Sequence, residues 1–433
     1  MMKVALWGYG KYGRRMYESL TRFCSDEYEV VRVYDRDYQK LKHTEGKISL
    51  PIHNPEELAE DYKDGVFEKV LLCFLWYEVL SEQEKYLKKH FIPGLHIGTE
   101  DDFCSASDFE QGEKPFTIQQ DGYSFSVLKN LYGAMANYES NELLYLFNNE
   151  GKVLQEHWSH WLAKPNVHVY DYPFVLKNSK AEKSFLKGQY CILTKQNVGN
   201  YWHFTYQCMD IVWLLEKAGY RGKYIVPNKH YCNEILHMLG VAPERIIPLG
   251  MFEHNRIYVF EEVFCVSFSA AKEIYGIDVL IKAAADIKKK LPVDLSLPKK
   301  IYIKRTGIRK LLEADALLEE YGFTSIIPEN YTVKEQMTLF YNADIVFSVH
   351  GANSTNCLYM RKNTVFIEAF SNYWKDRWNL YTLAAGKIHY LPVSSLENVV
   401  ECKNGRSEDF KIRETLLRMS IENAFLIYKA EHL

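Results

Sequence analysis

A run of small and polar residues at 347–360, FSVHGANSTNCLYM, joins the end of an apolar strand to the start of a predicted helix. Such a junction directs backbone N–H groups and the positive end of a helix toward one point, which suits a phosphate group. A strand–helix connection capped by a hydroxyl would explain the Ser and Thr but not the His and the small residues after it. We therefore predict phosphate binding by the residues of this turn: His350, Gly351, Ala352, Asn353, Ser354, Thr355 and Asn356.

Two arginines and a glutamate follow or end neighbouring predicted strands in the same region. Arg305 closes the strand in KIYIKRT, Arg309 lies four residues further on, and Glu368 lies near the end of VFIEAF. The arginines are predicted to add positive charge to the phosphate pocket, although a solvated strand-end charge is an open alternative for Arg305. Glu368 is predicted to bind ribose hydroxyls or the donor sugar, with a surface carboxylate as an equal alternative.

Three polar side chains share one face of an otherwise apolar predicted helix in NYWHFTYQCMDIVWLL. His203, Gln207 and Asp210 stand at i, i+4 and i+7, and a polar stripe on a buried helix must be paired or line a site. We predict that His203 or Asp210 is the general base for an acceptor hydroxyl and that the other residue orients it. A neutral histidine paired with a neighbouring backbone group is the alternative. The adjacent Tyr201 and Trp202 could stack on a sugar or belong to the core.

The N-terminal segment GYGKYG places Gly8, Gly10 and Gly13 in a GxGxxG pattern between a predicted strand and a predicted helix. Asp35 ends the next strand, where dinucleotide enzymes bind a ribose hydroxyl. The glycines also serve a tight turn without any ligand, and the unit is too short for a complete dinucleotide site. We favour an empty or remnant nucleotide module over a working NAD site, and we discount the DRD sequence at 35–37 as a metal motif.

Alternating strand and helix patterns recur after this unit. A hydrophilic stretch at 99–116 marks the first boundary, which gives a predicted Rossmann-like accessory domain over 1–110. Residues 111–275 and residues 276–433 are predicted to form two further lobes. Helices are predicted over 200–220, closed by Gly219, and over 309–323. The segment 139–163 is predicted to be partly helical, and 407–430 is predicted to be one long amphipathic helix.

The bulk composition excludes several classes of protein. The chain of 433 residues carries 53 basic and 56 acidic side chains, and a net charge of −3 does not favour binding to nucleic acid. Nine scattered cysteines, never at CxxC spacing, predict reduced thiols and argue against disulfides or a zinc site. MMKVALWGYG is predicted to be a strand rather than a signal peptide, and no apolar run approaches about 18 residues. We expect a cytoplasmic protein without a transmembrane segment.

Four blocks of the second half follow one another in a fixed order: GNYWHFTYQCMD (199–210), IYIKRTGIRKLLEADALLEEYGF (301–323), YTVKEQMTLFYNADIVFSVHGANSTN (331–356) and VFIEAF (365–370). In these blocks the sequence resembles glycosyltransferase family 61, over about residues 188–395. Members of that family carry an N-Y-x-H-F/W block, an Arg strand, an E-Q helix and an H-G-A-G-L-T-N turn before a strand that ends in Glu. Here Asn353 and Ser354 stand where Gly and Leu are usual, and residues 1–110 have no counterpart in the family's eukaryotic members.

The resemblance implies an α/β fold with a GT-B-like pair of Rossmann-type lobes, to which this chain adds a small N-terminal Rossmann-like domain. It implies that residues 111–275 form the acceptor-side lobe and residues 276–433 the nucleotide-sugar-binding lobe. It also implies an inverting transferase that needs no metal or cofactor and uses a nucleotide sugar as donor, with UDP favoured. We expect a hexosyl- or pentosyltransferase that acts on a glycan or a lipid-linked acceptor in the synthesis of surface polysaccharide, such as capsule. The enzyme would work in the cytoplasm, and contact of its C-terminal helix with the inner face of the membrane is left open.

Two other functions stay open at this point. One is an NAD(P)-dependent oxidoreductase or epimerase that uses the N-terminal glycine turn, although no Tyr-x-x-x-Lys pair follows it in a plausible catalytic helix. The other is a non-catalytic subunit that binds a sugar nucleotide, which the departures at Asn353 and Ser354 would permit.

Overall fold

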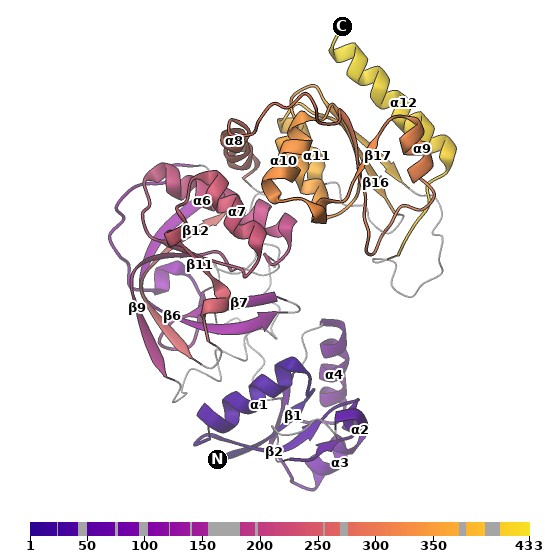
Figure 1. Ribbon diagram of the computed structural model, residues 1–433. Coiled ribbons are helices and arrows are strands. Elements are labelled where there is room, and N and C mark those ends of the chain that lie inside the picture. The colour runs from indigo at the N-terminus through magenta and orange to yellow at the C-terminus, as the bar shows by residue number, and fades with distance from the viewer. Residues whose placement is uncertain are drawn as a thin grey trace.

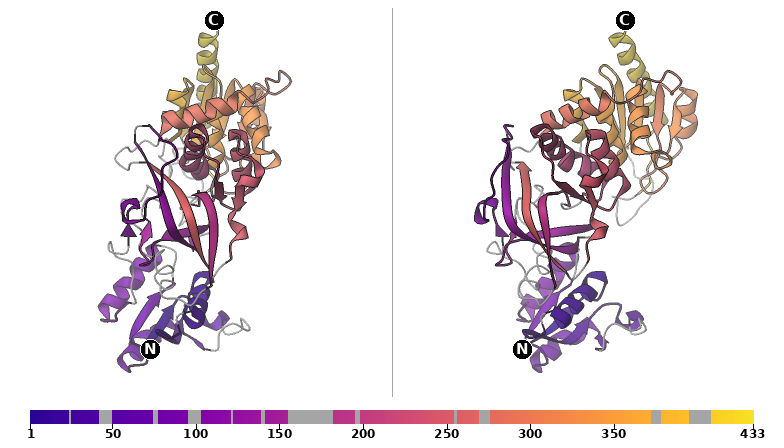
Figure 2. Two further views of the ribbon diagram at one scale, coloured as in Figure 1. Left: turned by 90° about the vertical axis from the view of Figure 1, so that its left-hand side faces the viewer. Right: turned by 60° about the vertical axis from the view of Figure 1, so that its left-hand side comes forward.

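The structure is a computed structural model, and it consists of three sheets with their helices, arranged in chain order from one end of the molecule to the other (Figure 1). It describes residues 1–23, 25–41, 50–73, 77–94, 103–120, 122–138, 141–154, 182–194, 198–253, 256–268, 276–371, 378–394 and 408–433. Two further views show the N-terminal unit at one end and the C-terminal helix projecting at the other (Figure 2).

The N-terminal unit is a four-stranded parallel sheet in the order β3-β2-β1-β4. Its strands are β1 (Met2–Trp7), β2 (Tyr28–Tyr34), β3 (Ile52–His53) and β4 (Lys69–Leu72). Its helices are α1 (Lys11–Phe23), α2 (Tyr38–Leu41), α3 (Leu58–Lys63) and α4 (Tyr77–Lys89). The strand predicted in MMKVALWGYG, the helix predicted after the glycine turn and the next predicted strand are confirmed.

The middle unit is an eight-stranded sheet in the order β11-β10-β9-β12-β6-β7-β8-β5. Its strands are β5 (Phe103–Cys104), β6 (Tyr123–Tyr138), β7 (Asn141–Phe147), β8 (Val153–Leu154), β9 (Lys183–Ile192), β10 (Lys223–Val226), β11 (Ile246–Pro248) and β12 (Ile257–Phe268). Its helices are α6 (Tyr201–Ala218), α7 (His230–Leu239) and α8 (Ile277–Lys288).

This middle sheet is mixed, whereas two successive parallel lobes were expected. Strands β12, β9, β10 and β11 are parallel, but β6 is antiparallel to β12 and β7 is antiparallel to β6. Only residues 139 and 140 separate β6 from β7, and so short a connection permits antiparallel pairing alone. The α/β class is nevertheless confirmed.

Strand β7 also corrects the prediction of helix within 139–163, because residues 141–147 and 153–154 are strands. Its side chains alternate between two apolar layers. Leu143, Tyr145 and Phe147 pack in one cluster with Val4 and Leu6 of the N-terminal unit, while Leu144 and Leu146 pack on the other face. Burial on both faces gives a continuous apolar run whose period cannot be read from sequence. Residues 155–163 lie outside the described residues.

The C-terminal unit is a five-stranded parallel sheet in the order β14-β13-β15-β16-β17. Its strands are β13 (Lys300–Ile303), β14 (Thr324–Ile326), β15 (Ile345–Val349), β16 (Val365–Phe370) and β17 (His389–Ser394). Its helices are α9 (Asp315–Glu320), α10 (Val333–Asn342), α11 (Trp378–Ala385) and α12 (Glu414–Glu431), with the 3-10 helix η9 at Ala352–Tyr359.

Two helices of this unit are shorter than predicted. The segment 309–323 is helical only over α9, because Arg309 and Glu313 take positive φ angles of 63° and 62° that an α-helix excludes. Between them, Leu311 forms a strand-like bridge with Phe410. That bridge also holds residues before Glu414 in extended form, so the C-terminal helix begins at 414 rather than 407.

One apolar core connects the middle and C-terminal units. It contains Phe204 and Met209 of α6, Met337 of α10, and Leu358 and Tyr359 of η9, all of them buried. Helix α6 starts where Asn200 caps the N–H of Trp202 and ends at Gly219, which takes the left-handed conformation with φ 91°. The predicted bounds of this helix are confirmed, and its first turn is packed against the C-terminal unit.

Candidate functional site

The turn between β15 and η9 lies at the carboxyl end of the C-terminal sheet. Ser354 is buried, its N–H donates to Gly351 O at 2.9 Å, and its hydroxyl contacts Ser348 Oγ at 3.0 Å. The N–H groups of Gly351, Ala352 and Asn353 make no hydrogen bond to any residue that the structure describes. Such amides at a helix start need an outside acceptor, and an anion is the acceptor that suits them.

Arg305 follows β13 and reaches across to this turn. Its Nη1 donates to His350 O at 3.1 Å and its Nε donates to Ile308 O at 3.0 Å. The guanidinium lies so close to Gly351 that a Cβ on that residue would meet Nη1 at 1.8 Å. Glycine at 351 leaves room for the guanidinium, which any side chain at this position would displace.

Arg309 lies beside Arg305 and the same glycine. A Cβ on Gly351 would be 3.7 Å from Arg309 Nη2. Burial, and then the charge of Arg305, lower the pKa of Arg309 to about 10. Burial also lowers the pKa of Arg305, against the opposing effect of the Glu329 carboxylate. Two guanidiniums that are half-buried and repel each other form a site that an anion with several oxygens would stabilise.

His350 and Glu368 form a buried pair on the other side of the turn. His350 Nδ1 lies 2.9 Å from Glu368 Oε1, and the imidazole stacks on Phe370 with centroids 4.7 Å apart. Glu368 is fully buried and also accepts hydrogen bonds from Asn379 Nδ2 at 3.0 Å and Tyr390 Oη at 2.9 Å. These contacts favour a positioning role for Glu368 over the predicted direct contact with a sugar.

The remaining residues of the turn point in different directions. Asn353 contacts the Glu329 carboxylate at 3.4 Å. Thr355 is buried, and its hydroxyl has no hydrogen-bond partner among the described residues. Asn356 is buried, and its Nδ2 donates to Gln336 Oε1 on α10 at 3.1 Å. Asn356 therefore holds elements together, and its predicted contact with phosphate stays a prediction.

The first turn of α6 meets this turn directly. Tyr201 Oη donates to Asn356 Oδ1 at 2.7 Å, and one turn further on Tyr206 Oη lies 2.7 Å from Thr382 Oγ1 of α11. Trp202 stacks on Tyr206 with centroids 4.8 Å apart. Tyr201 and Tyr206 are held by hydrogen bonds and are therefore structural, while both predicted sugar platforms, Tyr201 and Trp202, keep some exposure.

His203 lies on the partly exposed face of that first turn. Its Nδ1 is 3.0 Å from the Gln207 amide, and burial lowers the pKa of His203 to about 4. The ring is therefore neutral at pH 7. The Gln207 oxygen has no partner among the described residues, and turning the amide would let it accept the Nδ1 proton, which leaves the lone pair on Nε2.

Asp210 lies two turns further along α6 and is held by other groups. Its Oδ2 accepts a short hydrogen bond from Tyr123 Oη of β6, and its Oδ1 accepts from the N–H of Ile211 at 2.8 Å. Burial and the neighbouring Asp210 raise the pKa of Tyr123 far above its ordinary value, so the phenol stays the donor. These contacts favour a structural role, and Asp210 as base or as the group orienting His203 stays a prediction.

Several residues of this region were not singled out from sequence. Asn379 and Tyr390 come from α11 and β17, which the sequence patterns did not reveal as separate elements. Gln336 belongs to the E-Q helix and could have been found from that motif. By contrast, four predicted parts of the site do lie close together: the turn 350–356, Arg305, Arg309 and the first turn of α6.

The N-terminal glycine turn is formed as predicted, but its acidic residue is already engaged. A Cβ on Gly13 would meet Gly8 O at 1.9 Å, whereas Gly10 faces open space. Asp35 accepts from the N–H of Tyr9 at 2.6 Å and from the N–H of Asp37 at 2.8 Å. The glycines therefore serve the turn, and no contact here points to a ligand of Asp35.

A second acidic cluster of this unit has metal-type residues. His53, Glu57 and Asp61 bring their ligand atoms within 4.8 Å of one another. Asp61 Oδ2, however, accepts from Tyr34 Oη at 2.5 Å and from Arg32 Nε at 3.3 Å. A guanidinium at this distance opposes a bound dication, so the cluster is explained by its own ion pairs.

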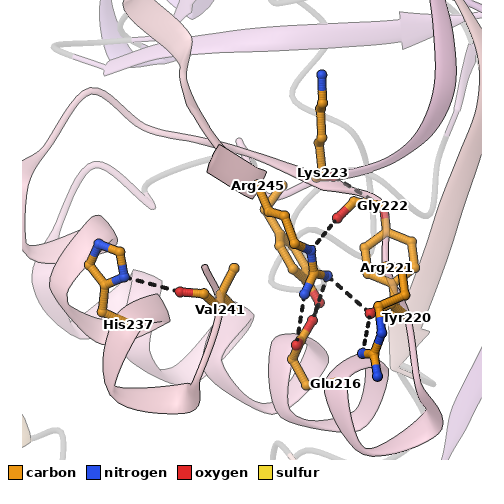
Figure 3. Close-up of polar contacts among 9 residues, drawn as sticks. Glu216, Tyr220, Arg221, Gly222, Lys223, His237, Val241 and Arg245 are labelled. Carbon is orange, nitrogen blue, oxygen red and sulfur yellow. Dashed lines mark hydrogen bonds and ion pairs between the residues drawn. The ribbon is translucent and has the colours of Figure 1, made fainter. Parts of the chain in front are cut away.

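The far end of α6 is held by a structural ion pair. Figure 3 shows that the Glu216 carboxylate accepts two hydrogen bonds from the Arg245 guanidinium; their lengths are 2.7 and 3.0 Å. Arg245 also donates to Gly222 O at 2.9 Å and lies over the rings of Tyr220 and Tyr224. This pair ties the end of α6 to the strands beside it and provides a comparison for the site at the other end.

Comparison with known proteins bears on this arrangement. Residues 201–367 match the model of a family described as Glycosyltransferase 61. The predicted resemblance to glycosyltransferase family 61 is confirmed. The matched segment is shorter than the predicted 188–395, but it contains the first turn of α6, both arginines and the His350 turn. Glu368 is the first residue beyond it. This match supports a glycosyltransferase domain over residues 201–367.

Other comparisons are less informative. The chain is similar to a solved structure titled Crystal Structure of UDP-D-Quinovosamine 4-Dehydrogenase from Vibrio fischeri, at 25% identity, 23% coverage of this chain, 81% coverage of that chain and a TM-score of 0.20. No curated protein matches the chain. Among the described helices, none is both long and apolar enough to cross a membrane.

Proposed function

We propose that this protein is an inverting glycosyltransferase that moves a sugar from a nucleotide-sugar donor, with UDP favoured, to a hydroxyl of a glycan or a lipid-linked acceptor. The proposal extends to the synthesis of surface polysaccharide in the cytoplasm. The observation that carries it is the pair Arg305 and Arg309 beside Gly351, where the amides of the turn lack acceptors among the described residues. Guanidinium groups and backbone N–H groups in this arrangement can stabilise the negative charge of a departing diphosphate.

Transfer with inversion needs one displacement. The acceptor oxygen forms a bond to the anomeric carbon of the donor sugar while the bond from that carbon to the phosphate oxygen breaks. The electron pair of the broken bond leaves on the diphosphate, where the two guanidiniums and the turn amides offset the developing charge. The acceptor proton passes to a base on the other side of the sugar.

We assign that base to His203. Burial keeps the pKa of its ring at about 4, so the ring is neutral at pH 7 and can accept a proton. Gln207 contacts Nδ1, and we assign Nε2 as the nitrogen that takes the acceptor proton. The hydrogen bond between Tyr201 and Asn356 keeps this turn of α6 beside the predicted phosphate site. Asp210 is the weaker candidate, since its two oxygens are engaged by Tyr123 and Ile211.

We further propose that the reaction proceeds without a divalent metal. The two arginines supply the positive charge that a magnesium or manganese ion supplies to the diphosphate in metal-dependent transferases. Activity retained in excess EDTA supports this part of the proposal. Activity lost in EDTA and restored by added magnesium or manganese contradicts it while leaving glycosyl transfer itself intact.

The experiment begins with thermal shifts in UDP, GDP, CMP and NAD, because a ligand that binds the folded state raises its melting temperature. A shift with a nucleoside diphosphate is expected, followed by release of that diphosphate from the matching nucleotide sugar. Arg305→Ala should abolish both. Lys304→Ala is the matched control, because its ammonium pairs with Asp315 at the surface. A shift with NAD alone would instead favour an oxidoreductase that uses the N-terminal glycine turn.

A further inference from the structure

Glu368 is a carboxylate with no exposed surface, and it lies directly beside the predicted phosphate site. Its Oε1 accepts from His350 Nδ1 and from Asn379 Nδ2, while its Oε2 accepts from Tyr390 Oη. These three hydrogen bonds come from the turn, α11 and β17, and because the carboxylate is 0% exposed, a sugar hydroxyl does not reach it. Glu368 is therefore expected to act through the residues that it contacts.

His350 is the one of these neighbours that borders the turn. Its N–H donates to Ala369 O at 2.9 Å, its carbonyl accepts from Arg305 Nη1, and its ring stacks on Phe370. Since Nδ1 lies against Glu368, the ring is held in one orientation, and Nε2 is the nitrogen that we assign to a ligand of the turn. Its side chain retains 16% exposure, against 0% for Glu368.

We propose, building on the proposed function, that Glu368 is a positioning residue that acts through His350 on the leaving diphosphate. The carboxylate fixes Nδ1 as a donor and compensates a positive charge on the imidazole, so that Nε2–H can donate to a phosphate oxygen. Asn379 and Tyr390 hold Glu368 in turn. The diphosphate is thereby held on one side by Arg305 and Arg309 and on the other by His350, with the turn amides between them.

This role can be separated from the predicted contact with ribose. A residue that acts on phosphate through His350 affects pyrophosphate and UDP alike, whereas a residue that binds ribose affects UDP alone. Calorimetric titration of the full chain with inorganic pyrophosphate and with UDP therefore distinguishes the two. In Glu368→Gln the affinity for both ligands should fall about 10- to 100-fold, because a charge-assisted hydrogen bond is lost. Tyr390→Phe, which removes one donor to Glu368, should show a smaller loss of the same kind and serves if the first variant does not fold.

A double-mutant cycle completes the test. In a His350→Ala background, Glu368→Gln should cause no further loss of affinity for pyrophosphate, because the effect of Glu368 passes through that ring. Losses that add independently would overturn the inference, and so would a loss confined to UDP or an unchanged affinity for both ligands. If the unmodified protein binds neither UDP nor pyrophosphate, the proposed function itself fails and the inference falls with it.

Discussion

Tyr201 of α6 donates a 2.7 Å hydrogen bond to Asn356 of η9, and this bond joins the two sequence blocks that carry most of the resemblance to family 61. Asn356 is fully buried and donates in turn to Gln336 of α10. Three elements from two sheets are thereby fixed around the start of α6. The general base that we propose lies two residues beyond Tyr201, so its position depends on this contact.

Replacing Tyr201 by phenylalanine tests that dependence. The substitution leaves Asn356 Oδ1 buried without its donor, and the free energy of unfolding should fall by about 1–3 kcal/mol. Urea unfolding measures the loss. Tyr132→Phe is the control, because the Tyr132 hydroxyl makes no hydrogen bond to the described residues, and it should change stability much less. Equal effects of the two substitutions would mean that the bond contributes nothing specific.

Gly351→Ala should damage ligand binding through Arg305. The added methyl would meet Arg305 Nη1 at 1.8 Å, so the guanidinium must leave its place beside the turn. We expect the affinity for UDP, measured by calorimetry, to fall about 10-fold or more, as for a lost charge-assisted hydrogen bond. Gly307 lies in the loop that carries Arg305, with nothing within 4 Å of an added methyl, so the Gly307→Ala protein should keep its affinity for UDP. Normal UDP binding by the Gly351→Ala protein would show that Arg305 does not contribute to the binding site.

His203→Gln should affect turnover rather than donor binding. The amide keeps the approximate size of the ring but cannot accept the acceptor proton, so kcat should fall about 100- to 10,000-fold while the KM for the donor changes little. Steady-state kinetics with the donor identified by thermal shift provide both constants. The exposed His230, replaced in the same way, is the control. A rise in KM with kcat preserved would assign His203 to substrate binding.

The same residue predicts how stability depends on pH. The pKa of His203 is lowered by burial from 6.5 to about 4, so the unfolded chain takes up a proton at a higher pH than the folded chain. Stability is unaffected above pH 6.5 and falls between pH 6.5 and 4, by up to about 3 kcal/mol from this group. His203→Gln should therefore lose less stability than the unmodified protein over that interval in urea titrations at each pH. Parallel curves for the two proteins would contradict the burial of the ring.

Much of this architecture follows from local sequence, and the reasons are visible in particular residues. Asn200 and Gly219 mark the two ends of α6 by capping and by a left-handed angle, which are local properties. His350 and Glu368 were each recognised at a strand end, but their pairing depends on the alignment of β15 with β16, where Ser348 stands opposite Glu368. No local pattern encodes that alignment, so the pairing of the two residues could not be predicted from the sequence.

Other features depend wholly on tertiary contacts. Arg309 reaches the turn because its backbone takes a positive φ of 63°, and in the predicted helix it would have pointed elsewhere. Asp210 was correctly placed on the His203 side of α6, yet its partner Tyr123 comes from β6, 87 residues earlier. The mixed character of the middle sheet likewise follows from long strands that pair across the chain and not from any local signal.

The ion pair at the other end of α6 should matter for stability alone. Glu216 and Arg245 have side-chain exposures of 15% and 14%, and removing one partner leaves the other charge without compensation. Arg245→Met should cost about 3 kcal/mol of unfolding free energy. The affinity of the folded protein for UDP should stay unchanged, since the pair lies far along α6 from His203. Weakened UDP binding in a folded Arg245→Met protein would show that the two ends of the helix are coupled.

A crystal structure of this protein with UDP tests the central claim most directly. The account predicts the diphosphate against the guanidiniums of Arg305 and Arg309, with phosphate oxygens accepting from the N–H groups of Gly351, Ala352 and Asn353. A diphosphate bound elsewhere, for example at the glycine turn of residues 8–13, with the 351–353 amides still lacking acceptors, would contradict it.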